Sequence, residues 1–212
     1  MEKEEKIQEK VKKTKILAIG DIHGDTGLVK RLAEKAKKEN VDIIILAGDL
    51  TMAERSTKYL IGPFVKEKKQ VLLIPGNHES DSTIEFLAQK YNVKNIHGYG
   101  FMKDDLGIFG AGTANTGIHQ ISDENIFRLL EKAHNEIKSA DKKIMVTHIH
   151  PLGSRAEKIF GFRGSETVRK AIEKFQPDIA INAHMHEAGG MEERIGKTWV
   201  INVSKKERVF EI

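Results

Sequence analysis

The stretch Gln70–Ser80, QVLLIPGNHES, decides how the rest of the chain is interpreted. Its apolar run Val71–Ile74 is continuous rather than alternating, so both faces of the corresponding strand must be covered, as in the interior of a parallel or mixed sheet. Polar groups at the carboxyl end of such a strand lie where open α/β sheets bind ligands. Here the run stops at a Pro-Gly pair and is followed at once by Asn77, His78 and Glu79.

Four other apolar runs end in the same way, each followed within a few residues by aspartate or histidine. These runs are Lys15–Gly20 before Asp21 and His23, Val41–Ala47 before Asp49, Lys143–Thr147 before His148 and His150, and Asp178–Asn182 before His184 and His186. We therefore expect five strands whose polar ends gather at one edge.

The spacing of the first three polar ends fits strand–helix–strand units. Asp21, Asp49 and Asn77 follow one another at intervals of 28 residues, close to the roughly 30 residues of such a unit. Between the first two, apolar residues recur at helical spacing from Leu28 to Ala36, which predicts a surface helix. Right-handed crossovers would place these three ends side by side.

Capping residues and apolar periodicity predict the remaining elements. The expected helices are part of Ala53–Lys68 with an interruption at Gly62-Pro63, a helix opened by a capping box at Ser82, one over about Ser122–Lys138, and one capped by Ser165 and ended by Pro177. Strands and turns are expected over Val93–Thr113, an irregular basic loop over Leu152–Gly164, and closing strands at Thr198–Val203 and Arg208–Ile212.

Length and composition favour a single domain. The 212 residues can bury a sizeable core and contain no evident linker, so we expect a charged lead at residues 1–13 and one domain at 14–212. Lys plus Arg (35) exceed Asp plus Glu (31) only slightly, which permits anionic substrates without indicating a nucleic-acid groove. The opening lacks an apolar targeting segment and no later run approaches membrane length, so we expect a cytoplasmic protein that does not span a membrane.

The absence of cysteine limits the metal chemistry, because it excludes thiol catalysis and zinc–thiolate sites. The candidate ligands instead mix carboxylate, amide and imidazole groups: Asp21, His23, Asp49, Asn77, His148, His184 and His186. Such a set suits manganese, iron, cobalt, nickel or zinc better than an all-oxygen calcium or magnesium site. Seven side chains exceed one tetrahedral site and are enough for two ions if one carboxylate is shared.

Two of the polar ends carry a pair of candidate ligands separated by one apolar residue. In an extended backbone the outer residues of such a triplet point the same way and can reach a common centre, whereas the middle one faces the core. The triplets are Asp21-Ile22-His23 and His184-Met185-His186. Either could be an ordinary turn or surface pair when taken alone, and Gly48-Asp49 is typical of a turn. The occurrence of all five motifs in this order, each after an apolar run, favours a metal centre.

Together these motifs resemble those of the calcineurin-like metallophosphoesterases, from Asp21 to about Ser204. The resemblance implies an α/β fold, a four-layer αββα sandwich of two mixed sheets, with the metals on loops at one end. It implies ligands of a first metal at Asp21, His23, Asp49 and His186. It implies ligands of a second metal at Asp49, Asn77, His148 and His184, with Asp49 bridging. By the same resemblance, His78 matches the family's general acid, which protonates the leaving oxygen.

Some residues near the motifs depart from the family pattern or have an open role. The family usually has glycine before the His-x-His pair, whereas this chain has Ala183, whose Cβ resists a left-handed backbone. His150 could contact substrate or merely pack. Arg155 and Arg163 could bind a phosphate through their planar guanidinium groups, or could simply be solvated.

The resemblance implies a phosphoesterase that uses two divalent transition-metal ions, manganese first, with iron, nickel, cobalt or zinc as alternatives. The expected reaction is in-line hydrolysis of a small phosphomonoester or phosphodiester, nucleotide-like substrates included, by a metal-bridging hydroxide with His78 as acid. One alternative is a metal-binding protein-interaction scaffold of the same fold, whose members lack the acid histidine. Another is a nuclease, for which there is little room after Ser204. The sequence leaves the natural substrate, the physiological metal and the oligomeric state open.

Overall fold

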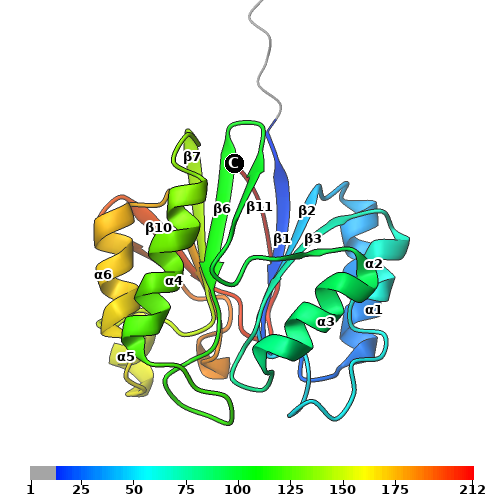
Figure 1. The fold of residues 1–212 in the computed structure, drawn as a ribbon, viewed down its shortest axis with the longest axis horizontal. Coiled ribbons are helices and arrows are strands. Elements are labelled where there is room, and N and C mark those ends of the chain that lie inside the picture. The colour runs from blue at the N-terminus through cyan, green and yellow to red at the C-terminus, as the bar shows by residue number, and fades with distance from the viewer. Residues whose placement is uncertain (1–12) are drawn as a thin grey trace, which may run out of the picture.

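Two mixed β-sheets pack face to face, and helices cover their outer faces (Figure 1). The computed structural model describes residues 13–212, so the predicted charged lead, apart from Lys13, lies outside the described residues. The αββα sandwich implied by the family resemblance is confirmed. Within residues 13–212, no helix combines the length and apolar character that crossing a lipid bilayer requires.

The first sheet places three of the predicted strands side by side. Its strands are β1 (Lys15–Ile19), β2 (Ile43–Ala47), β3 (Gln70–Ile74), β4 (Lys94–Asn95) and β11 (Arg208–Glu211). Their order is β11–β1–β2–β3–β4, with β11 antiparallel to β1 and all other neighbours parallel. Because β1, β2 and β3 are parallel neighbours, their polar carboxyl ends are adjacent, as the 28-residue spacing predicts.

The second sheet carries the two remaining strands with polar ends. Its strands are β5 (Gly100–Lys103), β6 (Leu106–Ala111), β7 (Lys142–Thr147), β8 (Ile179–Asn182), β9 (Glu192–Ile195) and β10 (Thr198–Asn202). Their order is β5–β6–β7–β8–β10–β9, with antiparallel strands only at the two edges. The expectation of a single edge is therefore wrong, because the five polar ends come from the facing edges of two sheets.

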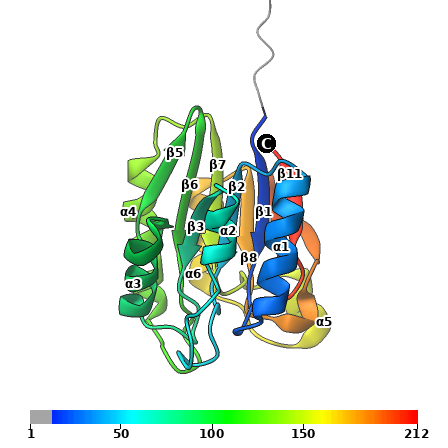
Figure 2. The same ribbon diagram turned by 90° about the vertical axis from the view of Figure 1, so that its right-hand side faces the viewer.

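Helices from the two halves of the sequence cover opposite sides of the sandwich (Figures 1 and 2). The helices packed on the first sheet are α1 (Thr26–Lys38), α2 (Gly62–Lys66) and α3 (Asp81–Tyr91). Those packed on the second sheet are α4 (Asp123–Glu136) and α6 (Glu166–Phe175). The short α5 (Arg155–Phe160) and the 3-10 turn η1 (His186–Ala188) lie in the loops that follow β7 and β8.

The strand β1 shows why the apolar runs are continuous. Leu17 and Ile19 pack toward the helices, whereas Ile16 and Ala18 pack against the second sheet. All four side chains are fully buried, since each face of the strand has a hydrophobic layer against it. Burial of this kind stabilises a fold by about 25 cal/mol per Å² of apolar surface removed from water.

Three local predictions need correction. Of the stretch Ala53–Lys68 only α2 is helical, and Gly62-Pro63 begin this helix instead of interrupting it. Before it, Ala53, Glu54 and Tyr59 have positive φ angles of 51°, 58° and 62°, which a helix does not allow. The loop expected at Leu152–Gly164 contains α5. The helix α3 begins after Ser80, whose hydroxyl accepts a hydrogen bond from the Thr83 N–H, so the cap lies two residues before the predicted box.

The two sheets are joined close to their polar ends. Gly20 at the end of β1 donates its N–H to the Val203 carbonyl at 2.9 Å, and its own carbonyl accepts from the Lys205 N–H at 3.1 Å. These bonds join the end of β1 to the chain that leaves β10, and so hold the polar ends of both sheets at one end of the molecule. The candidate site forms there.

Candidate metal centre

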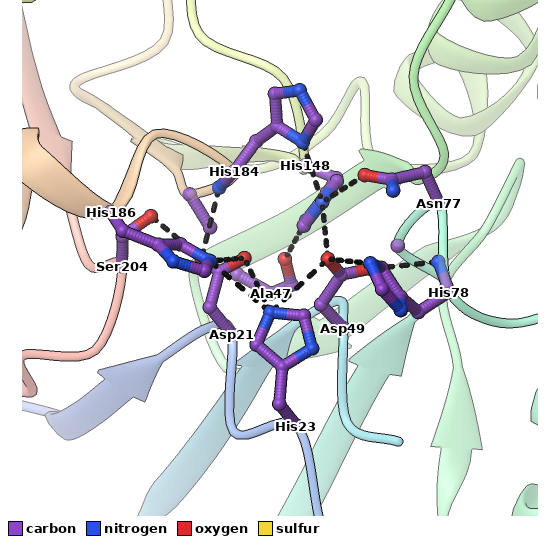
Figure 3. A network of polar contacts seen from close by, with 12 residues as sticks. Asp21, His23, Ala47, Asp49, Asn77, His78, His148, His184, His186 and Ser204 are labelled. Atoms are coloured by element: carbon purple, nitrogen blue, oxygen red, sulfur yellow. Dashed lines mark hydrogen bonds and ion pairs between the residues drawn. The ribbon is translucent and has the colours of Figure 1, made fainter. Parts of the chain in front are cut away.

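All seven predicted ligands and His78 converge between the ends of the two sheets (Figure 3). The first group joins the loops after β1 and β8. In it, His186 Nε2 lies 3.1 Å from His23 Nε2 and 3.3 Å from Asp21 Oδ1, and His23 Nε2 lies 3.7 Å from Asp21 Oδ1. Separations of this size are those expected between atoms that share one metal ion at bond lengths of about 2.0–2.2 Å.

The second group joins the loops after β2, β3, β7 and β8. His148 Nε2 lies 3.2 Å from Asn77 Oδ1, 3.3 Å from His184 Nδ1 and 3.5 Å from Asp49 Oδ2. His148 is fully buried and Asn77 nearly so. Four ligand atoms of mixed oxygen and nitrogen character therefore gather within reach of a second ion.

One oxygen of Asp49 lies within reach of both groups. Its Oδ2 is 3.6 Å from His23 Nε2 in the first group and 3.5 Å from His148 Nε2 in the second. Its other oxygen, Oδ1, accepts a hydrogen bond from the His78 N–H at 2.9 Å. The carboxylate is thus oriented with a single oxygen toward the centre.

Buried carbonyl groups fix the tautomers of two of the histidines. His148 Nδ1 lies 2.8 Å from the Ala47 carbonyl and His23 Nδ1 lies 3.3 Å from the Thr51 carbonyl. A carbonyl can only accept, so in each neutral ring Nδ1 carries the proton and Nε2 presents a lone pair to the centre.

Asp21 is oriented in the same manner as Asp49. Its Oδ2 accepts from the Ser204 hydroxyl at 2.6 Å and from the His184 N–H at 2.9 Å, which leaves Oδ1 facing the histidines. Carboxylate oxygens and imidazole nitrogens converge here, and these are ligand types that divalent transition metals accept. The residues present therefore fit a pair of divalent transition-metal ions.

Burial and neighbouring charges shift the pKa values of the candidate ligands. Burial alone would lower the pKa of His148, but the neighbouring carboxylate of Asp49, with that of Asp21, raises it to about 9. For Asp21, burial acts to raise the pKa, but the hydrogen bond from His186 and the charge of His148 leave it well below its usual range. Burial and the charge of His148 lower the pKa of His184 to about 4. Both carboxylates and at least one imidazole are accordingly ready to bind cations near neutral pH.

The backbone at the centre is not extended, which corrects the triplet argument. Asp21, His23, Asp49 and His184 have positive φ angles of 55°, 48°, 52° and 69°, a conformation that costs free energy in residues other than glycine. His184 and His186 consequently turn into different groups rather than a common one, whereas Asp21 and His23 lie in the same group as predicted. The middle residues of both triplets, Ile22 and Met185, are buried as expected.

His78 lies at the edge of the centre, next to both groups. Its Nε2 is 3.9 Å from Asp49 Oδ2, its ring meets that of His23 edge to face at 4.6 Å, and its side chain is 23% exposed. It follows Asn77 in the chain yet remains accessible from solvent. This is the placement that a proton donor to a bound ligand requires.

The candidate substrate residues separate in the structure. His150 is buried, and it and Arg163 line a cavity that also includes His184. Arg155 begins α5, where its backbone N–H donates to Glu193, and does not line that cavity. His97, a histidine outside the motifs, is buried, and its Nδ1 accepts from the Gly112 N–H.

Glu79, which follows Asn77 and His78 directly, supports the centre from outside the set of predicted ligands. Its fully buried carboxylate accepts hydrogen bonds from the Thr51 N–H at 2.6 Å, from the Thr51 hydroxyl at 2.8 Å and from the Gly76 N–H at 3.1 Å. It therefore joins the loop after Asp49 to the loop before Asn77. Burial, together with the charge of Asp49, raises the pKa of this carboxyl group. The sequence signal was its place directly after the Asn-His pair.

Replacing Glu79 with alanine is expected to lower the free energy of unfolding by roughly 3 kcal/mol, because buried N–H donors of Thr51 and Gly76 would lose their acceptor. Glu79→Gln should lose less, since its amide oxygen can still accept from Thr51. Denaturant titration of the metal-free protein measures both changes. The exposed Glu34 on α1 provides a control, and Glu34→Ala should change the stability by less than about 0.5 kcal/mol. Unchanged stability of Glu79→Ala would contradict this role.

Ala183 does not distort the loop before His184. The left-handed residue is His184 itself, and Ala183 is not among the residues with positive φ. The methyl group of Ala183 instead packs against Gly20, where an added Cβ would lie only 2.5 Å from the Ala183 Cβ. The pair thus has room for one methyl group at the junction of the two sheets.

Gly20→Ala is accordingly expected to destabilise the protein by about 1–3 kcal/mol through overpacking. The double variant Gly20→Ala, Ala183→Gly should recover a large part of this loss, because the methyl group moves across the contact rather than being added. Chemical unfolding of both single variants and the double variant measures the coupling. Strictly additive effects would show that the two positions do not share this space.

Comparisons with known proteins agree with the fold. The sequence profile of the calcineurin-like phosphoesterase family matches residues 14–188. A comparison with curated proteins gave no match. Among solved structures, a protein from Thermus thermophilus is similar with a TM-score of 0.74 and 20% identity, over 90% of this chain and 89% of that one.

Two further structures whose titles name an activity share the fold. A dimetal phosphatase from Danio rerio has a TM-score of 0.63 and 12% identity, over 89% of this chain and 86% of its own. An archaeal phosphodiesterase has a TM-score of 0.55 and 16% identity, over 94% of this chain and all of its own. At these identities the likeness concerns the fold alone. The family profile spans most of the chain, and on that ground the chain belongs to the calcineurin-like phosphoesterase family.

Proposed function

We propose that this protein hydrolyses a small phosphomonoester or phosphodiester with two divalent transition-metal ions, of which manganese is the first candidate. The observation that carries the proposal is the position of Asp49 Oδ2, which is 3.6 Å from His23 Nε2 and 3.5 Å from His148 Nε2. One oxygen held between two separate groups of ligands is what a pair of neighbouring ions needs. In our assignment Asp21, His23, Asp49 and His186 hold one ion, and Asp49, Asn77, His148 and His184 hold the other.

When bound, the two ions would polarise the phosphoryl oxygens and lower the pKa of water so that hydroxide is available near neutral pH. The protein's own contribution is orientation. Ser204 and the His184 N–H hold Asp21, and the His78 N–H holds Asp49, so the ligands do not have to reorganise when the substrate arrives.

We assign His78 as the general acid. Its side chain is partly exposed, with Nε2 3.9 Å from the shared oxygen of Asp49, so a phosphoester bound at the centre would place its leaving oxygen within reach. Protonation of that oxygen prevents the build-up of charge on the departing alkoxide. The same residue argues against the scaffold alternative, since the related scaffold proteins are expected to lack it.

Hydrolysis of aryl phosphates after controlled metal loading tests the proposal. The purified chain would be stripped with a chelator, reloaded with manganese, nickel or zinc, and assayed with 4-nitrophenyl phosphate and bis(4-nitrophenyl) phosphate. We expect activity that depends on the added metal, and the ratio of the two rates would distinguish a monoesterase from a diesterase. If the folded, metal-loaded protein hydrolysed neither compound, the binding scaffold would become the better account.

A further inference from the structure

A cavity of about 370 Å³ lies directly beside the candidate metal centre and shares His184 with it. Its lining combines the apolar side chains of Ile149, Met185 and Phe162 with polar ones, among them Asn115, Arg163 and Glu187. This volume and this mixture of groups are those of small-molecule sites in proteins. A substrate whose phosphate lies at the metal centre could therefore extend one ester group into this cavity.

One side of the cavity is fixed by the buried His150. Its Nε2 lies 3.1 Å from the Phe162 carbonyl, which can only accept, so Nε2 carries the proton. The His150 backbone carbonyl accepts from the Ser165 N–H at 2.8 Å. These two bonds hold the segment that carries Phe162 and Arg163, and Phe162, which is 58% exposed, is among the residues that line the cavity.

The side of the cavity that includes Asn115 belongs to a loop that is bound to Asn77, a candidate metal ligand. The residues after Asn115 fold back so that the His119 N–H donates to the Asn77 carbonyl at 3.0 Å. Gly117 packs so closely on Asn77 that an added Cβ would lie 2.4 Å from its Nδ2 atom. The loop that carries Asn115 is thus fixed relative to the metal centre, as a site that selects substrates requires.

The chemistry of the lining selects a ligand class. An exposed phenylalanine ring offers a face on which a planar ring can stack. The Asn115 amide nitrogen donates to Asp123 Oδ1 at 3.4 Å, its amide oxygen can accept a hydrogen bond, and the exposed Arg163 can donate to carbonyl oxygens. An alkyl ester offers these polar groups no hydrogen-bonding partner, whereas a nucleobase has a stackable face and an edge of donors and acceptors.

We propose that this cavity binds the nucleoside of a nucleoside phosphodiester, with Phe162 stacking on the base and Asn115 and Arg163 contacting its edge. The proposal rests on the phosphoesterase function proposed above. It extends that function by naming the class of substrate and the residues that select it. Phe162 is assigned to substrate binding and not to the bond-breaking step.

Two diesters with the same leaving group test the proposal. Thymidine 5′-(4-nitrophenyl) phosphate and methyl 4-nitrophenyl phosphate both release 4-nitrophenolate, so their difference reports on the retained ester group. We expect the manganese-loaded protein to show a kcat/KM at least about 10-fold higher for the thymidine ester, the size that one base–aromatic stack supports. Phe162→Ala should raise KM for that ester by about 10-fold with little change in kcat, and leave the methyl ester unaffected.

Matched variants show whether the effect belongs to this cavity. Phe86→Ala removes a phenylalanine of similar exposure on α3, and Arg128→Ala removes an exposed arginine on α4 that does not line the cavity. Both should behave as the unmodified protein, whereas Arg163→Ala should reduce the preference for the thymidine ester.

The possible failures are distinguishable. If both esters were hydrolysed equally well and Phe162→Ala changed neither, the nucleoside site would be refuted and the phosphoesterase function would stand. If the folded, metal-loaded protein hydrolysed neither ester, the proposed function itself would fail. Saturation-transfer NMR of thymidine with the metal-free protein provides a readout that does not depend on hydrolysis. A signal that is lost in Phe162→Ala and kept in Phe86→Ala is expected, and equal signals from both variants would refute the site.

Discussion

Asp49→Asn should lower phosphoester hydrolysis by roughly 10³-fold or more, because paired metal ions contribute several kcal/mol to such reactions at about 1.4 kcal/mol per tenfold. The substitution keeps the size of the side chain but not its ligand atoms. If the amide oxygen keeps the hydrogen bond from the His78 N–H, the amide nitrogen replaces the shared Oδ2. If the amide group is flipped, its nitrogen faces the His78 N–H, and two donors then oppose each other. In neither orientation can both ions be held as before.

Metal content and activity are to be measured on the same preparation. Elemental analysis should find fewer than two ions per chain in Asp49→Asn, with a far-ultraviolet spectrum like that of the unmodified protein. Asp104→Asn is the matched control, since Asp104 is exposed in a turn with a positive φ of 54°, which asparagine tolerates. Full metal content together with full activity in Asp49→Asn would refute the assignment of a shared carboxylate.

His78→Ala should reduce kcat by about 10²–10⁴-fold while both ions remain bound. The side chain of His78 is not among the assigned ligands, and the backbone N–H that holds Asp49 is retained in alanine. The loss should be smallest with 4-nitrophenyl esters, whose leaving group needs little protonation, and largest with alkyl esters. Steady-state kinetics on both kinds of ester, together with elemental analysis, measures the two effects separately.

His119→Ala is a suitable control for this experiment, because His119 is half-buried on the neighbouring loop and lies 3.9 Å from Glu54 rather than at the centre. Its loss should leave the dependence on the leaving group unchanged. An unaltered rate of alkyl ester hydrolysis in His78→Ala would remove this residue from the proposed mechanism. Loss of metal from His78→Ala would instead show that it supports the ligands.

The fold was largely predictable because each buried strand corresponds to a short, continuous apolar run in the sequence. A run such as Val71–Ile74 needs cover on both faces, and the structure provides helices on one side and the second sheet on the other. The helix α4 begins after Ser122, close to its predicted start, and α6 follows the predicted cap Ser165. The prediction of a helix was wrong between Ala53 and Tyr59, where positive φ angles prevent one.

The identities of the candidate site residues were also readable from the sequence, because each follows a strand directly. Their geometry was not. The sequence does not say that His184 and His186 turn into different groups, since this depends on the left-handed backbone at His184. It also gave no sign that Glu79 joins two loops, because its partners Thr51 and Gly76 are brought to it by the pairing of β2 with β3.

The sequence by itself determined which strands form and which polar side chains stand at their ends, because hydrophobic periodicity and chain order act over a few residues. Only the tertiary structure decided which sheet supplies each of those ends, that one oxygen of Asp49 lies within reach of both groups, and that Ala183 fits opposite Gly20. These features depend on distances between residues far apart in the chain. Such distances are set by the packing of one sheet against the other, which no local pattern specifies.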